Sequence, residues 1–193
     1  DLQPFFTPEA IELRSFAIID AETPAPRPFV GNEWELARRL VHTTGDFDIL
    51  QRLKFREQAV RAGVTALRNG ALILTDTKMA EAGMPERRLA PLGARVCCML
   101  SLPNVAELAA QKKQTRSRAA IEAAYPLLPG CILAVGNAPT ALLGLLDYLD
   151  KGGVPPALVL AMPVGFVNAA ESKALVWKRE LPVITIVGRK GGS

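Results

Sequence analysis

The chain contains a single histidine, His42, within the segment 42–48 (HTTGDFD). Histidine is the side chain whose unperturbed pKa, about 6.5, lets it gain or lose a proton near neutrality. If this protein transfers protons at physiological pH, His42 is therefore the first candidate. A histidine can also serve only as a polar cap at a helix end, and its position alone does not separate the two roles.

The residues around His42 predict the end of a helix. Asn32 is a suitable N-cap, apolar residues then recur at helical spacing, and Gly45 suits the left-handed turn that ends a helix. His42 would thus lie in the last turn, where the helix dipole favours the imidazolium form. Asp46 and Asp48 follow directly as partners for that charge, so the arrangement predicts a general acid.

The composition is that of a globular chain with a modest positive charge. Of its 193 residues, 49% are hydrophobic and 22% are charged, and 23 Lys and Arg against 19 Asp and Glu give a net charge of +4. This balance excludes a disordered chain and suits one domain with a single core. The charge alone suits a small anion or a nucleic acid, but the basic residues form no long run, and we expect no nucleic-acid partner.

The cysteines and the hydropathy pattern bear on the compartment. Cys97, Cys98 and Cys131 lie in apolar runs without ligand spacing, which predicts reduced, buried thiols rather than disulfides or a metal site. No uncharged apolar stretch of 18 residues occurs, and the first four residues do not resemble a signal peptide. We therefore expect a cytoplasmic protein without a membrane partner.

Apolar runs alternate with helical patterns along the chain. Strands are expected at 71–75, 95–100, 131–135, 157–161 and 182–187, and helices at 56–69, 116–125, 140–149 and 168–178. A short apolar run at 15–20 and an extended, Pro-rich linker at 21–31 precede them. Continuous apolar strands alternating with helices predict an α/β fold: a single domain over 1–193, with three α/β/α layers and a mostly parallel sheet.

Several of the expected strands end in segments suited to a ligand. The carboxyl ends of parallel strands line one edge of a sheet, where ligands bind. Asp76 follows one strand, and loops rich in Gly, Pro or Asn follow three others, at 136–140, 163–166 and 188–193. Backbone N–H groups in such loops can approach a ligand closely.

Positive charge is available at two of these places for a carboxylate or a phosphate. Arg189 and Lys190 lie in the last loop, and Arg116 opens a helix whose first N–H groups are free donors. Each signal is weak by itself, because glycine-rich turns are often only turns and Arg116 alone can be a surface residue. A phosphate- or nucleotide-binding α/β domain fits the same features, although no Walker or GxGxxG pattern is present.

Taken together, the motifs are more specific: the sequence resembles the precorrin-8X methylmutase family, which includes the cobalt-precorrin-8 methylmutases of cobalamin biosynthesis. The resemblance rests on short collinear blocks that cover nearly the whole chain. The blocks are 14–19 (RSFAII), 42–48, Asp76 with Met79, 115–117 (TRS), 136–142 (GNAPTAL), 163–167 (PVGFV), 170–173 (AESK) and 188–193 (GRKGGS).

The resemblance implies an isomerase that moves a methyl group from C11 to C12 of a corrinoid ring, a formal 1,5-sigmatropic shift. The product is hydrogenobyrinate, or cobyrinate when cobalt is present. The resemblance also implies an α/β homodimer without a separate cofactor, and its catalytic histidine corresponds to His42, which we expect to donate a proton to the conjugated ring. A non-catalytic tetrapyrrole-binding protein is the alternative, but His42 and Asp46 argue against it.

The corrinoid carries acetate and propionate groups around its rim, so its site needs hydrogen-bond donors, whereas the methyl shift needs no nucleophile, metal or redox centre. The substrate-binding residues we expect are Arg14, Ser15, Asp46, Asp76, Thr115, Arg116, Ser117, Gly136, Asn137, Ala138, Pro163, Val164, Gly165, Lys173, Arg189, Lys190 and Gly191.

Two features depart from the family pattern. Asn168 stands where the family commonly has Gly, and relatives usually continue beyond Ser193 into an alanine-rich segment that this sequence does not contain. We therefore expect the loop at 167–170 to differ in shape from that of the family.

Overall fold

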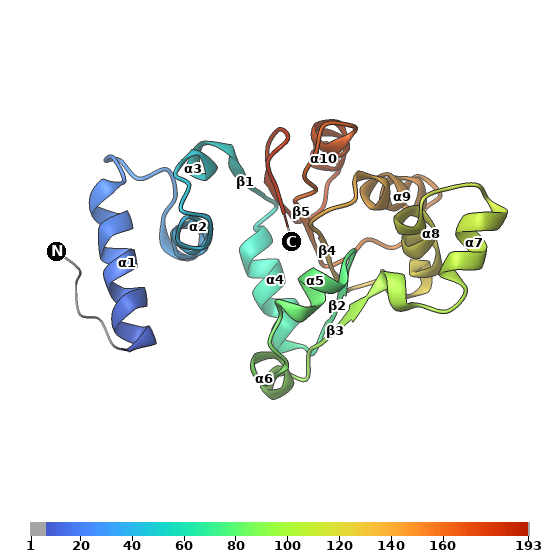
Figure 1. Cartoon of the computed structure of the whole chain (residues 1–193), viewed down its shortest axis with the longest axis horizontal. Helices are drawn as coiled ribbons and strands as arrows, with labels where there is room; N and C mark the ends of the chain where they lie inside the picture. The colour runs from blue at the N-terminus through green and yellow to red at the C-terminus, as the bar shows by residue number, and fades with distance from the viewer. Residues whose placement is uncertain (1–6, 193) are drawn as a thin grey trace. The chain divides into compact units, whose positions relative to one another are not determined.

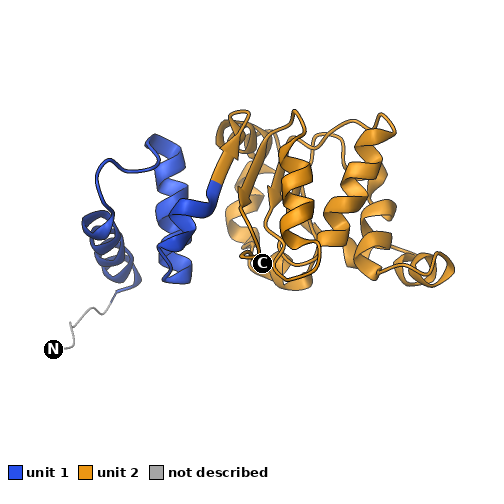
Figure 2. Ribbon diagram, turned by 90° about the horizontal axis from the view of Figure 1, so that it is seen from above, with its two compact units in different colours: residues 1–53 blue, residues 54–193 orange. Residues whose placement is uncertain are grey.

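The structure, a computed structural model, describes residues 7–192, so the first residues considered above and Ser193 lie outside it. The chain divides into two compact units, Asp1–Leu53 and Lys54–Ser193 (Figure 2). The single domain expected over 1–193 stays a prediction. Among the described residues, no helix has the length and apolar character needed to span a bilayer.

The first unit is helical. It contains α1 (Pro8–Glu22), α2 (Gly31–Thr44) and α3 (Asp48–Arg52). The apolar run at 15–20 lies inside α1, which the Thr7 side chain caps by accepting a hydrogen bond from the Ala10 N–H at 3.2 Å. Within the segment 21–31, where an extended linker was expected, α1 extends to residue 22, α2 already begins at residue 31, and residues 23–30 lie outside helices and strands.

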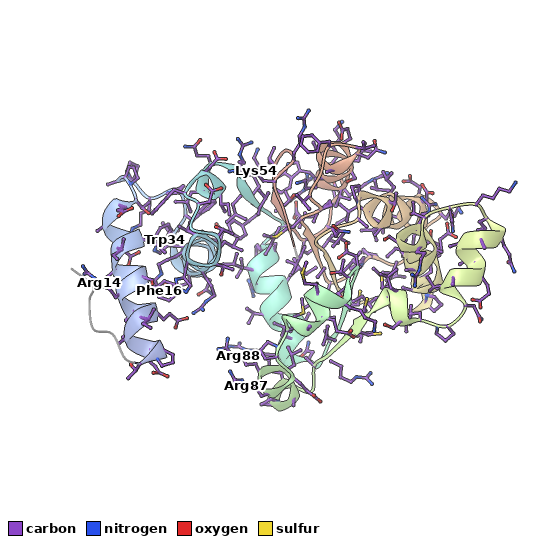
Figure 3. All side chains as sticks on the ribbon, viewed as in Figure 1. Arg14, Phe16, Trp34, Lys54, Arg87 and Arg88 are labelled. Carbon is purple, nitrogen blue, oxygen red and sulfur yellow. The ribbon has the colours of Figure 1, made fainter. Side chains whose placement is uncertain are left out.

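Polar contacts join α1 to α2. The Trp34 indole N–H donates to the Asp20 carboxylate at 3.2 Å, and the Arg38 guanidinium pairs with the same carboxylate at 2.9 Å. The side chains of Phe16 and Trp34 lie between the two helices (Figure 3). A buried aromatic ring and a shared carboxylate therefore hold the helix that carries His42 against α1.

The second unit contains a six-stranded sheet (Figure 1). Its strands are β1 (Leu53–Arg56), β2 (Leu72–Thr75), β3 (Arg95–Cys98), β4 (Ile132–Val135), β5 (Leu158–Ala161) and β6 (Val183–Ile186), in the order β1-β6-β5-β4-β2-β3. The strands from β2 to β6 pair in parallel, with Thr75 beside Ala134 and Ala161 beside Thr185. The expected α/β class with a mostly parallel sheet is confirmed.

The strand order reverses at β2. β3 lies on one side of β2, whereas β4, β5 and β6 follow one another on the other side. This is the order of doubly wound sheets of the flavodoxin type, in which ligands bind beyond the carboxyl ends of the strands where the order reverses. A ligand is therefore expected beside the residues that follow β2 and β4.

Helices cover both faces of this sheet. On one face α4 (Ala59–Arg68) packs so closely that a Cβ on Gly63 would lie 2.7 Å from the Leu158 side chain. The alternate strand residues Leu133 and Val159 face a second core, to which α8 (Arg116–Ala123), α9 (Pro139–Asp150) and α10 (Ala169–Trp177) contribute. Shorter helices are α5 (Lys78–Ala82), α6 (Glu86–Leu89) and α7 (Val105–Gln111), with 3-10 turns at Ala90–Leu92, Met99–Ser101 and Tyr125–Leu127.

The helix expected at 56–69 is present as α4, but its expected start was wrong, because the helix begins at Ala59 and ends at Arg68. The strand β1, at Leu53–Arg56, was not predicted from the sequence. The other strands and helices of the unit that were expected lie within about two residues of their predicted ends, except that the strand at 95–100 stops at Cys98 and enters a 3-10 turn.

Candidate active site

Asp76, at the carboxyl end of β2, organises the loop that follows β4. Its carboxylate is 2% exposed and accepts three main-chain hydrogen bonds, from Gly136 at 2.9 Å, Asn137 at 2.8 Å and Ala138 at 2.7 Å. These donors lead directly into α9, whose dipole also stabilises a negative charge at this end. The structure thus brings together four of the expected site residues at the point where the strand order reverses.

The N–H groups expected to face a ligand are therefore bonded to Asp76. Gly136 and Ala138 are buried, and Asn137 is the member of the loop whose side chain is exposed. The carboxylate of Asp76 acts as an internal anion that fixes the loop, as an N-cap side chain fixes a helix start. Direct contact of these residues with the substrate stays a prediction.

Thr115, Arg116 and Ser117 open α8 beside this loop. The Thr115 side chain caps the helix by accepting the Arg118 N–H at 3.2 Å, and its hydroxyl donates to Thr140 of α9 at 3.0 Å. The Arg116 side chain is exposed and forms no ion pair with any described residue, whereas Arg118 is bound to two carboxylates. Arg116 is thus the arginine of this helix whose guanidinium remains available.

Glu122 holds α8 in place from its other end. Its carboxylate pairs with Arg118 at 2.9 Å and with Lys112 at 2.8 Å, and it accepts a hydrogen bond from Gln114 at 3.1 Å. Burial opposes its ionisation, but the hydrogen bonds from Lys112, Arg118 and Gln114 outweigh burial and lower the pKa of Glu122 to about 2. The helix that presents Arg116 is therefore fixed by a partly buried, ionised acid.

The loop after β5 and the loop after β6 are joined to each other. The Gly165 N–H donates to the Arg189 carbonyl at 3.2 Å, and the Gly192 N–H donates to the Met162 carbonyl at 2.9 Å. A Cβ on Gly191 would collide with the Met162 carbonyl oxygen, so the close approach requires glycine there. Two segments of expected site residues, 163–165 and 189–191, thus form one structure.

Lys173 ties α10 to the same loops. It is 2% exposed, and its ammonium donates to the Lys190 carbonyl at 2.7 Å. Among the described residues no carboxylate pairs with it, and burial lowers the pKa of Lys173 to about 8. The lysine is therefore a buried cation that holds the last loop by its backbone.

Apolar side chains stand exposed around these loops. Phe166 is 82% exposed, Val167 is 77% exposed and Val164 is 43% exposed, and the Arg189 guanidinium lies 5.2 Å from the centre of the Phe166 ring. Such a pair of aromatic ring and cation offers both an apolar face and a positive charge. Phe166 belongs to the family block at 163–167 but was not among the expected site residues.

Asn168 shows how the chain accommodates its departure from the family pattern. It adopts the left-handed conformation, with φ 61° and ψ 5°, immediately before α10. Glycine is the residue best suited to this conformation, and Asn tolerates it better than most other residues do. The backbone therefore takes a glycine-like turn at 168 without a glycine.

In the first unit, His42 lies in the last turn of α2 as predicted. Gly45 ends the helix in the left-handed conformation, with φ 64°, and its N–H donates to the Val41 carbonyl at 2.7 Å. The half-buried imidazole meets the Phe16 ring edge-on, with ring centres 5.4 Å apart and an interplanar angle of 64°. This contact orients the ring of His42, and it could not be predicted from the sequence.

Two arginines flank the same aromatic ring. The guanidinium groups of Arg38 and Arg39 lie 4.4 Å and 5.2 Å from the centre of the Phe16 ring, on the helix turn that precedes His42. Arg38 is paired with Asp20 and Arg39 with Glu12. The positive charge of each arginine is therefore balanced by a carboxylate of α1.

The other site residues expected in the first unit make local contacts. Asp46 accepts the Asp48 N–H at 2.9 Å, and Asp48 pairs with Arg52 at 2.6 Å, so both acids help to start α3. Their partnership with His42 stays a prediction. Arg14 is exposed on α1 (Figure 3), and the Ser15 hydroxyl donates to the Ile11 carbonyl at 2.8 Å.

No group of three or more His, Cys, Asp or Glu side chains suited to a metal ion occurs between residues 7 and 192. The three thiols are free; Cys98 and Cys131 are buried, and burial raises the pKa of Cys131 to about 12. Cys131 is thus an unreactive core residue.

Comparison with known proteins identifies the family. Residues 10–193 match the precorrin-8X methylmutase family. The chain is 41% identical over 191 residues to a cobalt-precorrin-8 methylmutase of Leptospira interrogans, which covers 95% of this chain and 86% of that protein. It is 43% identical over 186 residues to a precorrin-8X methylmutase of Sinorhizobium sp., covering 95% and 88% of the two chains.

A solved structure agrees with these matches in sequence and in fold. A crystal structure of precorrin-8X methylmutase from Thermus thermophilus superposes with a TM-score of 0.86 at 42% identity, covering 95% of this chain and 89% of that one. The collinear blocks, the sheet order and the position of the single histidine are therefore explained together: the chain belongs to the precorrin-8X methylmutase family, a family of isomerases.

Proposed function

We propose that this chain catalyses the methyl migration of its family, from C11 to C12 of precorrin-8X or of cobalt-precorrin-8, in cobalamin biosynthesis. The observation that carries the proposal is the single histidine in the last turn of α2, held edge-on by Phe16, in a chain that matches the family over residues 10–193. A methyl shift within a conjugated ring needs one group that stabilises developing positive charge or lends a proton.

His42 is the proton donor in this proposal. Its imidazolium gives a proton, or a strong hydrogen bond, to the conjugated system beside the migrating methyl group. Because the reaction is an isomerisation with no net change in protons, the imidazole takes the proton back when the rearrangement is complete. The contact with Phe16 supports this role, since it limits rotation of the imidazole and keeps its N–H direction defined.

The loops at the carboxyl edge of the sheet are the substrate anchors in this proposal. Arg116, Arg189 and Lys190 supply positive charge for the acetate and propionate groups of the rim. The exposed side chains of Val164, Phe166 and Val167 suit the apolar faces of a large flat ring. An inorganic phosphate would leave this apolar surface unused.

Two further points of the proposal concern the state of the protein. We propose a homodimer, supported by apolar side chains of α1 that are exposed in the single chain: Ile11 at 49%, Leu13 at 69% and Ile18 at 41%. Sedimentation at micromolar concentration should report about twice the mass of the chain, and a monomer that turns over substrate would contradict the dimer. The three free thiols support a cytoplasmic location, where thiols stay reduced.

The decisive experiment incubates the protein with precorrin-8X, with its cobalt-containing form and with ATP. The proposal expects a new visible absorption spectrum at unchanged mass for at least one corrinoid, because the product is an isomer. Binding of the corrinoid without conversion would identify a non-catalytic tetrapyrrole-binding protein instead. Binding of ATP without binding of either corrinoid would identify a nucleotide-binding domain.

A further inference from the structure

A cavity of about 230 Å³ lies in the second unit between α10, β6 with the loop that follows it, and β1. We call it the α10 cavity. Its apolar wall is formed by Ala170, Ala174, Trp177 and Val187, and its polar lining includes three lysines, Lys54, Lys173 and Lys178. Figure 3 shows Lys54 on β1.

The charge of the α10 cavity is of one sign. No aspartate or glutamate lines it, and none of the three lysines forms an ion pair with a described residue. Lys54 and Lys178 are exposed, but Lys173 is 2% exposed and uses one of its three N–H donors, at 2.7 Å, on the Lys190 carbonyl. An ammonium group in this environment is stabilised by an anion that enters beside it.

The size of the α10 cavity limits what that anion can be. Sites that enclose a whole drug-sized ligand are usually about 300–1,000 Å³ in volume. The α10 cavity is smaller and has an aromatic and aliphatic wall, with Lys54 Nζ 5.9 Å from the centre of the Trp177 ring. A short aliphatic chain that ends in a carboxylate fits this combination, whereas an inorganic anion would leave the apolar wall unused.

We propose that the α10 cavity binds an aliphatic carboxylate. This inference rests on the proposed function, since the carboxylate would be one acetate or propionate arm of the corrinoid. A small free acid is the other source of the same chemistry. The arm is favoured because Gly188 lines the cavity and Lys173 contacts Lys190, so the cavity adjoins the last loop at the carboxyl edge of the sheet.

The first arm of the test uses sodium propionate against sodium chloride at equal ionic strength, with tryptophan fluorescence as the readout. We expect a saturable change with propionate, none with the neutral isostere propionamide, and its loss in Trp177→Phe. Lys173→Met should weaken propionate binding at least tenfold, and Lys54→Met and Lys178→Met less. Lys151→Met, which removes an exposed lysine of another element, is the matched control and should change nothing.

The second arm measures the affinity of the same variants for hydrogenobyrinate. A loss of at least tenfold in Lys173→Met, with Lys151→Met unchanged and with propionate binding that also needs Lys173, supports the corrinoid arm as the occupant. A loss of hydrogenobyrinate affinity in Lys173→Met without propionate binding to the unaltered protein would be explained by the freed Lys190 loop and would overturn the proposal. Saturable propionate binding that needs Lys173, together with unchanged hydrogenobyrinate affinity, assigns the cavity to a free acid. If Lys173→Met changes the affinity for neither propionate nor hydrogenobyrinate, and circular dichroism shows that this variant is folded, the proposal is overturned.

The two arms also separate this proposal from the proposed function. If the unaltered protein neither binds nor converts a corrinoid, the proposed function fails, and the propionate titration still decides whether the cavity is a carboxylate site. If the protein isomerises its substrate and Lys173→Met affects neither titration, only the inference about the cavity fails.

Discussion

The Asp76 carboxylate, at the end of β2, accepts a hydrogen bond of 2.7 Å from the main-chain N–H of Ala138, at the start of α9. With the Gly136 and Asn137 N–H groups, the same buried side chain takes three donors from a loop 60 or more positions further along the chain. These hydrogen bonds join the segments that follow β2 and β4, the two neighbouring strands at which the sheet order reverses. The edge of the sheet that we propose to bind substrate is thus fixed by an internal anion.

Replacing Asp76 should show how much the loop depends on it. Asp76→Asn removes the charge and places an amide N–H₂ group against at least one main-chain donor. Since a hydrogen bond to a charged group contributes about 1.5–3 kcal/mol, we expect a loss of about 3 kcal/mol or more in the free energy of unfolding. Urea unfolding measures this loss.

Asp150→Asn is the matched control, because Asp150 forms an exposed ion pair with Arg179 at 2.7 Å, and such pairs contribute about 0–1 kcal/mol. Equal, small effects of the two substitutions would show that Asp76 does not hold the loop.

Most strands of the sheet could be predicted because they are short, continuous apolar segments of the sequence. Segments such as 132–135 and 158–161 are uninterrupted apolar runs, as expected for strands buried on both faces. β1 was missed because its sequence, LKFR, alternates apolar and basic residues and lies at the edge of the sheet. The apolar run at 15–20 was ambiguous because a short run has no period that separates strand from helix.

Asn168 allows the left-handed turn before α10 to be tested directly. With φ at 61°, alanine should be less stable than the present asparagine by about 1 kcal/mol, whereas glycine should be equal or slightly more stable. Thermal or urea unfolding of Asn168→Gly and Asn168→Ala checks this order. Asn104, also at φ 61° before a helix, should show the same order. An alanine variant as stable as the glycine variant would contradict the reason given.

Lys173 should make the stability depend on pH in the alkaline range. Burial lowers its folded pKa to about 8, against 10.5 when unfolded, so between these values the unfolded chain binds one more proton than the folded chain. Stability therefore rises with pH through this window, by on the order of 3 kcal/mol at most from this residue. Lys54 and Lys178 are the other titratable groups that line the α10 cavity.

Lys173→Met removes this dependence. Below pH 8 the variant should be equal to or more stable than the unaltered protein, because relief of the buried charge, on the order of 3 kcal/mol, offsets the lost hydrogen bond to Lys190, about 1–3 kcal/mol. As pH approaches 10.5 only the lost hydrogen bond remains, so the variant should become the less stable protein. Urea unfolding at several pH values measures the difference. A variant that is less stable at every pH would mean that Lys173 stabilises the fold and that its buried charge does not lower the free energy of unfolding.

Arg116 should act on binding rather than on stability. Because its guanidinium is exposed at the start of α8 without a carboxylate partner in the described part of the chain, Arg116→Ala should leave unfolding unchanged. We expect it to weaken corrinoid binding by about 1.5–3 kcal/mol, the range for a hydrogen bond to a charged group. Arg88→Ala, on α6 (Figure 3), is the control. Equal affinity in both variants would make Arg116 a surface residue.

The individual site residues could be chosen from the sequence, but their contacts could not. Nothing near Asp76 in the sequence shows that its partners are 136–138, because the sheet brings them together. Lys173 was expected to bind substrate, and only the fold shows that it is buried against the Lys190 backbone. Phe16 could be noticed as an aromatic residue in a family block, but its contact with His42 depends on how α1 packs on α2.

His42 gives the sharpest test of the chemistry. If its imidazolium lends the proton, His42→Ala should bind hydrogenobyrinate within about threefold of the unaltered protein but convert substrate about 10²–10⁴-fold more slowly, the usual loss for a general acid. Added imidazole should restore part of the rate. Phe16→Leu, which keeps the acid but loosens its ring contact, should slow conversion much less. Loss of binding in His42→Ala, with whatever substrate still binds converting at the unaltered single-turnover rate, would instead make His42 a residue that positions the ring, and another group would then have to supply the proton.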